Sequence, residues 1–297
     1  DKAMIITIAK GSVSAAIDSH GAQLLSFKKG DKEYIWQRDP KFWASCAPIL
    51  FPVVGRLRDG VLRIDGKDYP MPMHGFVRDM ELTVTAQSED AVTFCLTDSE
   101  KTKEFYPWSF SFSVTFSIEG EKLTVSFAVE NRDDKTMIFG LGGHPAFNVP
   151  MEDGAAFTDY QLVFEKEERL DTDICNMETI EIYGDEKKTV LDGGRTLPLT
   201  RSLFNGDALI FEDITSRSVD LVHKDTKKGI RFAYGDFPIL AVWTRGEPQE
   251  APYVCLEPWY SMGFRRGEGT DINDKYGMQH LAPGKTFAAA FSAEILD

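Results

Sequence analysis

Apolar and polar residues alternate strictly from Phe110 to Ile118, where serine or threonine separates each apolar residue from the next. A two-residue period places every apolar side chain on one face of an extended strand and every polar one on the other. After Glu-Gly-Glu-Lys at 119–122, which is typical of a turn, the alternation resumes from Leu123 to Val129. The two segments therefore predict an antiparallel hairpin with one buried and one wet face.

The same period recurs in short segments along the whole chain, separated by turn residues such as Asp-Gly-Gly at 192–194. Helical patterns are scarce: residues 99–106 fit about two turns and residues 200–204 about one. No linker or repeat divides the chain, so we expect a single domain over residues 1–297, an all-β fold built as a large antiparallel β-sandwich with few short helices. Further strands are predicted at Ile6–Ile8, Val13–Ile17, Leu82–Val84, Val92–Leu96, Val219–Val222, Ile230–Tyr234 and Phe287–Ile295.

The composition excludes several classes of protein. Hydrophobic residues make up 42% of the 297 residues, which excludes an intrinsically disordered chain. The net charge of −14 repels phosphate backbones and anionic lipids, and no basic patch interrupts it. No apolar stretch approaches the roughly 18 residues that span a bilayer. We therefore expect neither a nucleic acid nor a membrane as partner.

The cysteines and histidines indicate neither a disulfide framework nor a metal centre. The four cysteines are far apart, form no Cys-x-x-Cys pair and lie mostly in apolar, strand-like contexts. Such cysteines are typical of reduced thiols, so we expect a cytoplasmic protein. No His-x-His or His-Glu-x-x-His pattern appears, which favours chemistry without a metal. The cysteines are Cys46, Cys95, Cys175 and Cys255.

Two segments depart from the alternation and concentrate arginine, histidine and glycine. Residues 51–79 contain Arg56, which could donate paired hydrogen bonds to hydroxyls or form a surface ion pair, and His74, which could equally be a core histidine. Residues 140–148 contain three glycines and His144 before a proline. A functional loop is favoured there over a β-bulge that His144 caps.

A third segment, residues 252–260, ends an apolar run with Glu257, followed by Pro, Trp and Tyr. A carboxylate in such a run needs a partner, so either a salt bridge or catalysis would explain it. Trp259, next to this carboxylate, could stack on a sugar face. The remaining tryptophans, Trp36, Trp43, Trp108 and Trp243, are expected in the core.

Together these segments resemble the aldose 1-epimerase family of galactose mutarotase-like enzymes, and most closely its LacX-like bacterial branch. The resemblance covers nearly the whole chain and depends on the order and spacing of short motifs. The motifs are Phe-Pro-x-x-Gly-Arg at Phe51–Arg56, His-Gly-Phe at His74–Phe76, Gly-Gly-His-Pro-x-Phe-Asn at Gly142–Asn148, Asp-Ala-Leu-Ile-Phe at Asp207–Phe211 and Leu-Glu-Pro-Trp at Leu256–Trp259.

The resemblance implies a β-supersandwich whose concave face binds a monosaccharide. It implies Glu257 as general base and His144 as general acid, at opposite edges of one bound pyranose. It also implies that His74, Arg56 and Asp207 bind hydroxyls, although an aspartate after Asn-Gly is also an ordinary turn former.

The reaction implied is the interconversion of the α and β anomers of a free aldohexose, which needs one acid and one base and no cofactor or metal. Two alternatives stay open from the sequence. One is a hexose-6-phosphate mutarotase, in which Arg56, Arg58 or Arg78 holds the phosphate. The other is a carbohydrate-binding or sensing protein without turnover. The sequence indicates no oligomeric state.

Overall fold

The computed structural model describes residues 3–297, and its strands pair in antiparallel sheets. This arrangement confirms the predicted large antiparallel β-architecture. The largest sheet has nine strands, in the spatial order β17 (Thr196–Pro198), β14 (Tyr160–Phe164), β19 (Ser218–His223), β20 (Gly229–Ala233), β24 (Thr286–Leu296), β10 (Lys122–Asn131), β9 (Phe110–Glu119), β8 (Ala91–Thr97) and β7 (Thr83–Gln87).

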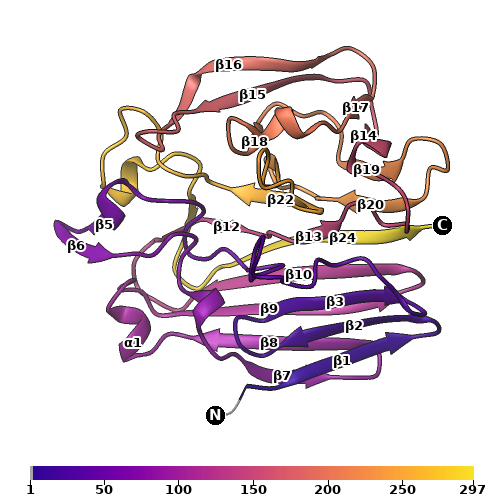
Figure 1. Cartoon of the computed structure of the whole chain (residues 1–297). Helices are drawn as coiled ribbons and strands as arrows, with labels where there is room; N and C mark the ends of the chain where they lie inside the picture. The colour runs from indigo at the N-terminus through magenta and orange to yellow at the C-terminus, as the bar shows by residue number, and fades with distance from the viewer. Residues whose placement is uncertain (1–2) are drawn as a thin grey trace.

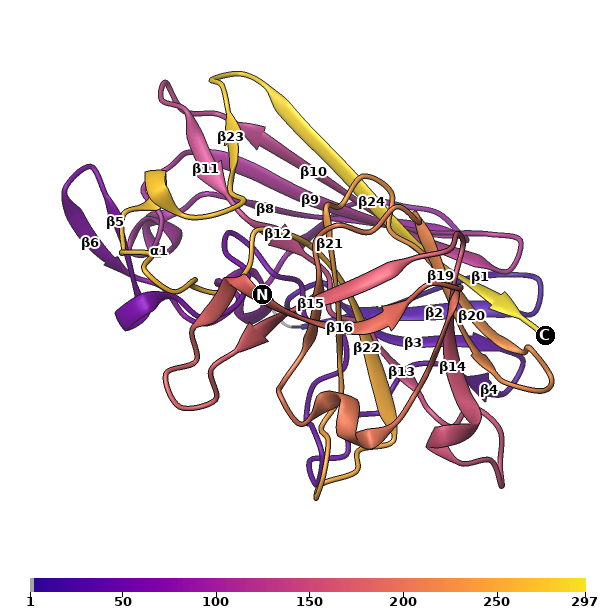
Figure 2. The same cartoon turned by 90° about the horizontal axis from the view of Figure 1, so that it is seen from above.

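The second large sheet has seven strands and carries most of the candidate chemistry. In Figure 2, β8, β9, β10 and β24 occupy the upper part of the view and β15, β16 and β22 lie below them. The path of this sheet is β12 (Leu141–Gly142), β22 (Tyr253–Tyr260), β21 (Ile239–Trp243), β18 (Leu209–Phe211), β15 (Arg169–Cys175) and β16 (Ile182–Asp192), with β13 (Ala146–Asn148) also paired to β22.

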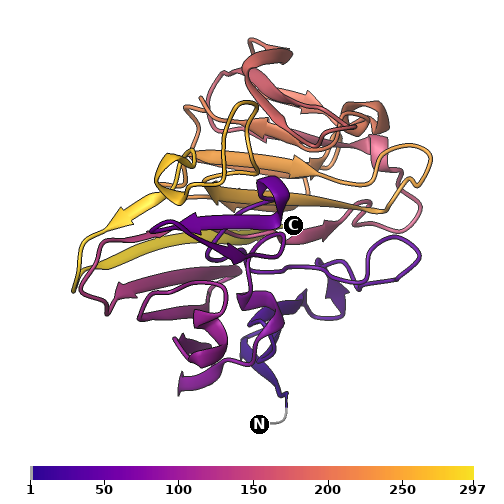
Figure 3. The ribbon, with the colours of Figure 1, turned by 90° about the vertical axis from the view of Figure 1, so that its left-hand side faces the viewer.

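Smaller sheets complete the sandwich. In Figure 1, β1, β2 and β3 lie low in the view, beside β7 to β10, while β15 and β16 lie at the top. In Figure 3 the violet β5–β6 region lies next to the yellow segment near residue 270, and Arg63 N–H donates to the Thr270 carbonyl at 2.8 Å. The small sheets are β1 (Ile5–Lys10), β2 (Val13–Asp18), β3 (Gln23–Lys29) and β4 (Lys32–Glu33); β5 (Val61–Ile64) and β6 (Lys67–Pro70); and β11 (Met137–Phe139) and β23 (Gln279–Leu281).

The hairpin predicted from the alternation is present as β9 and β10. Apolar and polar positions alternate between buried and half-buried along both strands, and Phe116 lies opposite Val125 in the register. Phe112 and Phe127 pack with ring centroids 6.0 Å apart in the same buried cluster that includes most of the apolar core. A strand with one wet face thus forms where the sequence alternates.

Helices are short, and one is shorter than predicted. The helix expected over residues 99–106 is the single turn α1 (Glu100–Lys103), which begins with a capping box formed by Ser99 and Thr102. Beyond Lys103 the chain continues as a turn, in which the N–H groups of Phe105 and Tyr106 donate to the Thr102 carbonyl at 3.0 and 2.8 Å, and Pro107 follows. The turn expected at 200–204 is a 3₁₀ helix. The 3₁₀ helices are Arg58–Gly60, Val77–Asp79, Phe157–Asp159, Arg201–Phe204 and Ile272–Asp274. Within residues 3–297, no helix has the length and apolarity to cross a bilayer.

Candidate active site

The loop at residues 51–56 and the turn that carries His74 hold each other in place. Gly55 N–H donates to His74 Nδ1 at 2.9 Å, and His74 N–H donates to the Gly55 carbonyl at 3.0 Å. Gly55 has φ +75°, and a Cβ there would lie 2.7 Å from the Gly263 backbone, so glycine is required. Because Nδ1 accepts this hydrogen bond, the neutral His74 ring carries its proton on Nε2.

His74 is held as a neutral donor. Burial lowers the pKa of His74 well below its usual range, and the nearby His144, Arg78 and Arg56 add to the effect. The residue has φ +65°, a conformation that is uncommon outside glycine and is often found at functional sites. The alternative of a fully enclosed core histidine does not hold, because His74 is only partly buried and lines a cavity.

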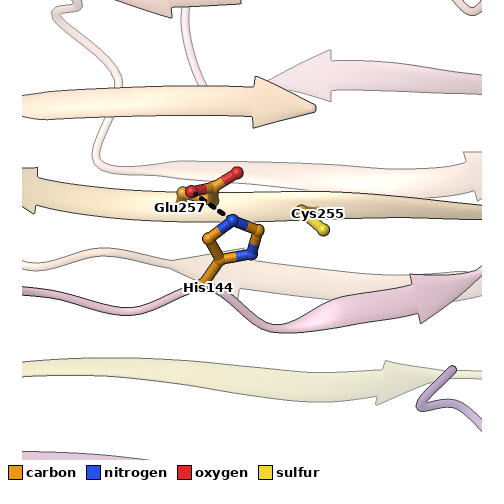
Figure 4. Close-up of side chains that lie close together, drawn as sticks. All are labelled: His144, Cys255 and Glu257. Carbon is orange, nitrogen blue, oxygen red and sulfur yellow. Dashed lines mark ion pairs between the residues drawn. The ribbon is translucent and has the colours of Figure 1, made fainter. Parts of the chain in front are cut away.

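The Gly-Gly-His-Pro segment crosses between two short strands, β12 and β13, that both pair with β22. A Cβ on Gly142 would lie 2.9 Å from the Trp259 ring, and one on Gly143 would lie 2.6 Å from the Phe291 ring. The glycines therefore allow the chain to lie directly against its neighbours. The strand is interrupted between β12 and β13, a feature that the alternative of a β-bulge shares with that of a loop. The ring of His144 turns toward β22 (Figure 4).

His144 and Glu257 form a buried pair. His144 Nε2 lies 3.1 Å from Glu257 Oε1, and the two side chains are 8% and 2% exposed (Figure 4). The sequence placed them at opposite edges of a pyranose, whereas the structure brings them into direct contact. Contact suits the expected reaction, since the hydroxyl oxygen and the ring oxygen that exchange protons are both bonded to the same carbon.

Burial favours the neutral form of both partners. It raises the pKa of Glu257 well above its usual range, Asp207 adds to this, and the indole of Trp259 partly opposes it. Burial, with Arg78 adding, lowers the pKa of His144 to about 3. Between the lowered pKa of His144 and the raised pKa of Glu257 the pair therefore shares one titratable proton, and burial favours the carboxyl as its carrier.

All six residues named from the sequence line one cavity of about 470 Å³. Arg56 and Asp207 are solvent-exposed on its wall, and desolvation by the surrounding protein nevertheless raises the pKa of the Asp207 carboxyl. Asp207 has φ +74°, so it is also held in a left-handed conformation. The six are Arg56, His74, His144, Asp207, Glu257 and Trp259.

The two further arginines offered for a phosphate separate in the structure. Arg78 lines the cavity, and its buried Nε forms no hydrogen bond within residues 3–297. Arg58 lies outside the cavity lining, donates to Glu181 at 2.8 Å and to the Glu268 carbonyl at 2.5 Å. Of the three arginines offered for a phosphate, Arg58 is therefore the least suited, because its guanidinium is already engaged.

Sequence reasoning missed the aromatic wall of the cavity. Trp43 and Trp243, expected in the core, are only partly buried, and their ring centroids lie 5.0 Å and 5.7 Å from that of His144. The strand pairing explains the position of Trp243: Ala241 lies opposite Glu257, so Trp243, two residues further along β21, shares its face. Trp43 lies in a loop without periodicity and gave no signal.

One set of side chains near the site could hold a metal ion. Ligand atoms of His144, Cys255 and Glu257 all lie within 4.8 Å of one another (Figure 4), and nitrogen, sulfur and oxygen donors suit Zn²⁺. Burial raises the pKa of the Cys255 thiol well above its usual range, so a metal would have to displace a firmly held proton. The chemistry proposed below uses no metal.

Comparison with known proteins identifies the family. The chain matches the aldose 1-epimerase family over residues 4–287. It is 32% identical to the chromosomal protein LacX of Lactococcus lactis subsp. lactis, over 99% of this chain and 100% of LacX. The chain belongs to the aldose 1-epimerase family, and this membership supports an isomerase that acts on sugars.

Two further proteins are similar to this chain. A galactose mutarotase related enzyme from Lactobacillus acidophilus has a similar structure, with a TM-score of 0.92, 32% identity, and coverage of 99% of this chain and 98% of that one. A putative glucose-6-phosphate 1-epimerase from Salmonella typhimurium is 25% identical, over 86% of this chain and 83% of the relative.

Proposed function

We propose that the protein is a mutarotase that interconverts the α and β anomers of a free aldohexose. The observation that carries the proposal is the 3.1 Å contact between His144 Nε2 and Glu257 Oε1 inside a cavity of about 470 Å³. One acid and one base side by side can act on the two oxygens of a single anomeric carbon.

In the proposed reaction Glu257, as carboxylate, takes the proton from the anomeric hydroxyl while His144 gives a proton to the ring oxygen. The bond from the anomeric carbon to the ring oxygen breaks, and the free aldehyde forms. Rotation about the adjacent carbon–carbon bond and reclosure with the roles reversed produce the other anomer. Each positioned group typically contributes about 10² to 10⁴ in rate, so the pair supplies roughly 5 to 11 kcal/mol.

This assignment requires the shared proton to lie on His144 when the sugar is bound. Burial favours the proton on Glu257, but a bound sugar changes the surroundings of the carboxyl. An anomeric hydroxyl that donates to Glu257 stabilises the carboxylate, since hydrogen bonding to the charged form favours that form. The total of one proton on the pair is the same in both arrangements, so substrate binding only relocates it.

The remaining predicted residues are assigned to sugar binding. His74 offers an Nε2–H donor whose direction is fixed by the Gly55 hydrogen bond. Arg56 forms no ion pair or side-chain hydrogen bond within residues 3–297, so its donors are available to hydroxyls. Asp207 provides acceptors on the same wall, and Trp259 provides an apolar ring face beside Glu257.

The test is anomer exchange measured by NMR for a panel of free hexoses, with and without the protein. We expect exchange between the anomeric signals to be accelerated for at least one aldohexose. Absence of acceleration across the panel, with sugar binding still detected, would favour the alternative of a carbohydrate-binding protein without turnover.

A hexose-6-phosphate is the second candidate substrate, and the cationic part of the cavity favours it. Arg78 has a buried Nε without a hydrogen-bond partner in the described chain, and Arg56 and Arg245 also line the cavity. The Salmonella typhimurium relative is named for glucose 6-phosphate. Comparing kcat/KM for glucose and glucose 6-phosphate separates the two, and Arg78→Gln should reduce only the rate on the phosphorylated sugar.

A further inference from the structure

A second group of charged side chains lies outside the cavity lining, between β15, β16 and the residue that follows β18. Lys187 Nζ lies 2.6 Å from Asp173 Oδ1 and 3.1 Å from Glu212 Oε2. The side chain of Asp173 is fully buried and that of Glu212 is 11% exposed. None of the three residues lines the cavity. One ammonium group therefore faces two carboxyl groups that are largely removed from water.

The neighbouring side chains do not balance the second carboxylate. Tyr276 is uncharged and donates its O–H to Glu212 Oε1 at 2.5 Å. The Arg265 guanidinium lies over the Tyr276 ring, 3.7 Å from its centroid, and forms no ion pair within residues 3–297. The Cys175 thiol, two residues further along β15, is neutral because burial raises its pKa to about 12. Two ionised carboxylates would therefore leave one uncompensated charge in a dehydrated place, which is costly.

A shared proton removes this cost. Asp173 Oδ2 is buried and forms no hydrogen bond within the described chain, whereas a protonated Asp173 can donate from it to Glu212. Burial raises the pKa of Asp173 to about 7, with Glu212 adding to the effect and Lys187 partly opposing it. Burial alone would raise the pKa of Glu212 as well, but hydrogen bonds from its neighbours, Asp173 first, lower it. The shared proton therefore belongs on Asp173 in weakly acidic solution.

The two carboxyl groups lie at a narrow junction of the seven-stranded sheet. β15 pairs with β18 at one register position, Thr172 opposite Phe211, and the Ile210 N–H donates to Thr172 Oγ1 at 2.8 Å. Asp173 and Glu212 directly follow the two paired residues. They therefore provide the next tie between the hairpin β15–β16, at the top of Figure 1, and the rest of the sheet.

Both ends of this hairpin are held by other contacts. Ile182, at the start of β16, donates its N–H to the Phe264 carbonyl at 3.0 Å, and the Arg266 N–H donates to the Ile182 carbonyl at 2.9 Å. Just before β15, Glu168 accepts from the Ser216 N–H at 2.7 Å. A change at Asp173 therefore acts on the junction with β18 and leaves the ends of the hairpin in place.

We propose that Asp173, Lys187 and Glu212 form a proton-dependent clasp, which closes the junction between β15 and β18 and releases it as the shared proton is lost. In an open junction Asp173 is hydrated and titrates near its ordinary pKa of about 4. The closed junction binds the proton more tightly, so the clasp is strongest in acid, weakens as the pH rises, and levels off above about pH 7. The inference does not depend on the proposed function.

The experiment measures amide hydrogen exchange by NMR between pH 5 and 8, corrected for the intrinsic pH dependence of exchange. The Ile210 N–H reports the junction and the Ile182 N–H reports a held end of the hairpin. We expect the opening constant at Ile210 to rise roughly hundredfold, since loss of one proton changes it by up to about tenfold per pH unit. The opening constant at Ile182 should change by less than about threefold. Asp173→Asn, which keeps the shape and the donor of the protonated carboxyl, should abolish the rise at Ile210.

The matched control is Asp171→Asn on the same strand. A hydrogen bond from Thr189 lowers the pKa of Asp171, so this residue stays ionised between pH 5 and 8 and its substitution should leave the rise at Ile210 unchanged. Glu212→Gln removes the neighbouring charge that raises the pKa of Asp173, so it should reduce the rise at least threefold; it decides the question if Asp173→Asn does not fold.

Three results would overturn the clasp. The opening constant at Ile210 could stay constant between pH 5 and 8, or its rise could persist in Asp173→Asn and in Glu212→Gln. Ile182 could also show the same rise as Ile210, in which case the proton acts on unfolding of the whole chain and not on the junction. We expect open molecules to remain a small fraction at every pH, so hydrogen exchange detects them where anomer exchange does not.

Discussion

The strands β10 and β22 are similar in length and are organised differently. Along β10, buried positions alternate with half-buried ones, and every fully buried side chain except that of Asn131 at its end is apolar. Along β22 every residue is buried, and Glu257 lies among them with its side chain 2% exposed. The first strand has a wet face that can take any polar residue. The second is covered on both faces, so a carboxyl there is dehydrated and its proton affinity changes. The candidate chemistry therefore lies on the strand in which buried and half-buried positions do not alternate.

The largest expected effect comes from replacing one carboxyl oxygen of a glutamate by an amide nitrogen, in β22 and, as a control, in β10. Glu257→Gln should reduce the rate of anomer exchange by about two to four decades, because the general base is lost while the shape is kept. Glu130→Gln, on the half-buried face of β10, is the matched control and should leave the rate unchanged. Full activity of Glu257→Gln would remove that residue from its assigned role.

A substitution in the core face of β10 should change stability and leave activity unaffected. Phe127, 2% exposed on β10, packs against Phe112 and Phe291 with ring centroids 6.0 Å from each. Phe127→Ala should lower the free energy of unfolding by about 3 to 5 kcal/mol through loss of burial and a cavity, measured by urea denaturation. Activity per folded molecule should stay within about twofold, since Phe127 does not line the cavity. A large loss of kcat in the folded fraction would contradict the separation of the two regions.

A third substitution is at a glycine that supports both the fold and the candidate site. Gly75 has φ +79°, and a Cβ there would lie 2.1 Å from the Phe51 carbonyl oxygen. Gly75→Ala should cost about 1 to 3 kcal/mol of stability and displace the adjacent His74, which raises KM by roughly tenfold. Thermal unfolding and steady-state kinetics on one preparation measure both effects. An unchanged KM in a destabilised variant would show that His74 does not contact the sugar.

The smallest expected effect is in the pH dependence. The pKa of His144 is lowered to about 3 and that of Glu257 is raised, so the pair keeps one proton as the pH falls through the ordinary histidine range. We therefore expect kcat/KM to vary by less than about twofold between roughly pH 5 and 6.5, where an ordinary histidine would titrate. It should fall only near pH 3 and, on the alkaline side, above the raised pKa of Glu257. A decline centred near pH 6.5 would show that His144 is not dehydrated in the working enzyme.

The sequence predicted those parts of the molecule that depend on local period. The β9–β10 hairpin follows directly from the alternation between Phe110 and Val129. The shortened helix at 100–103 did not follow, because the position at which the last helical turn loosens before Pro107 is not fixed by local propensity. The extent of the domain, the cytoplasmic location and the roles of the site residues stay predictions.

The six proposed site residues were found through motifs, and the structure places them at one cavity. The rest of that cavity could not be predicted in the same way. Trp43 is brought there by a loop whose path depends on long-range contacts, such as the packing of its ring against that of Trp243, with centroids 5.6 Å apart. Arg58 looked equivalent to its neighbour Arg56, and the positions of Glu181 and Glu268, each more than a hundred residues away, distinguish them.

The position of β24 has a consequence for how the chain matures during translation. This strand lies between β20 and β10 in the middle of the nine-stranded sheet, and its Phe291 ring packs beneath Gly143, next to His144. A nascent chain that ends before residue 286 exposes two unpaired strand edges, which favours association with other chains. Until β24 has left the ribosome, the incomplete sheet therefore depends on protection against aggregation, and we expect chaperones to bind it during that interval.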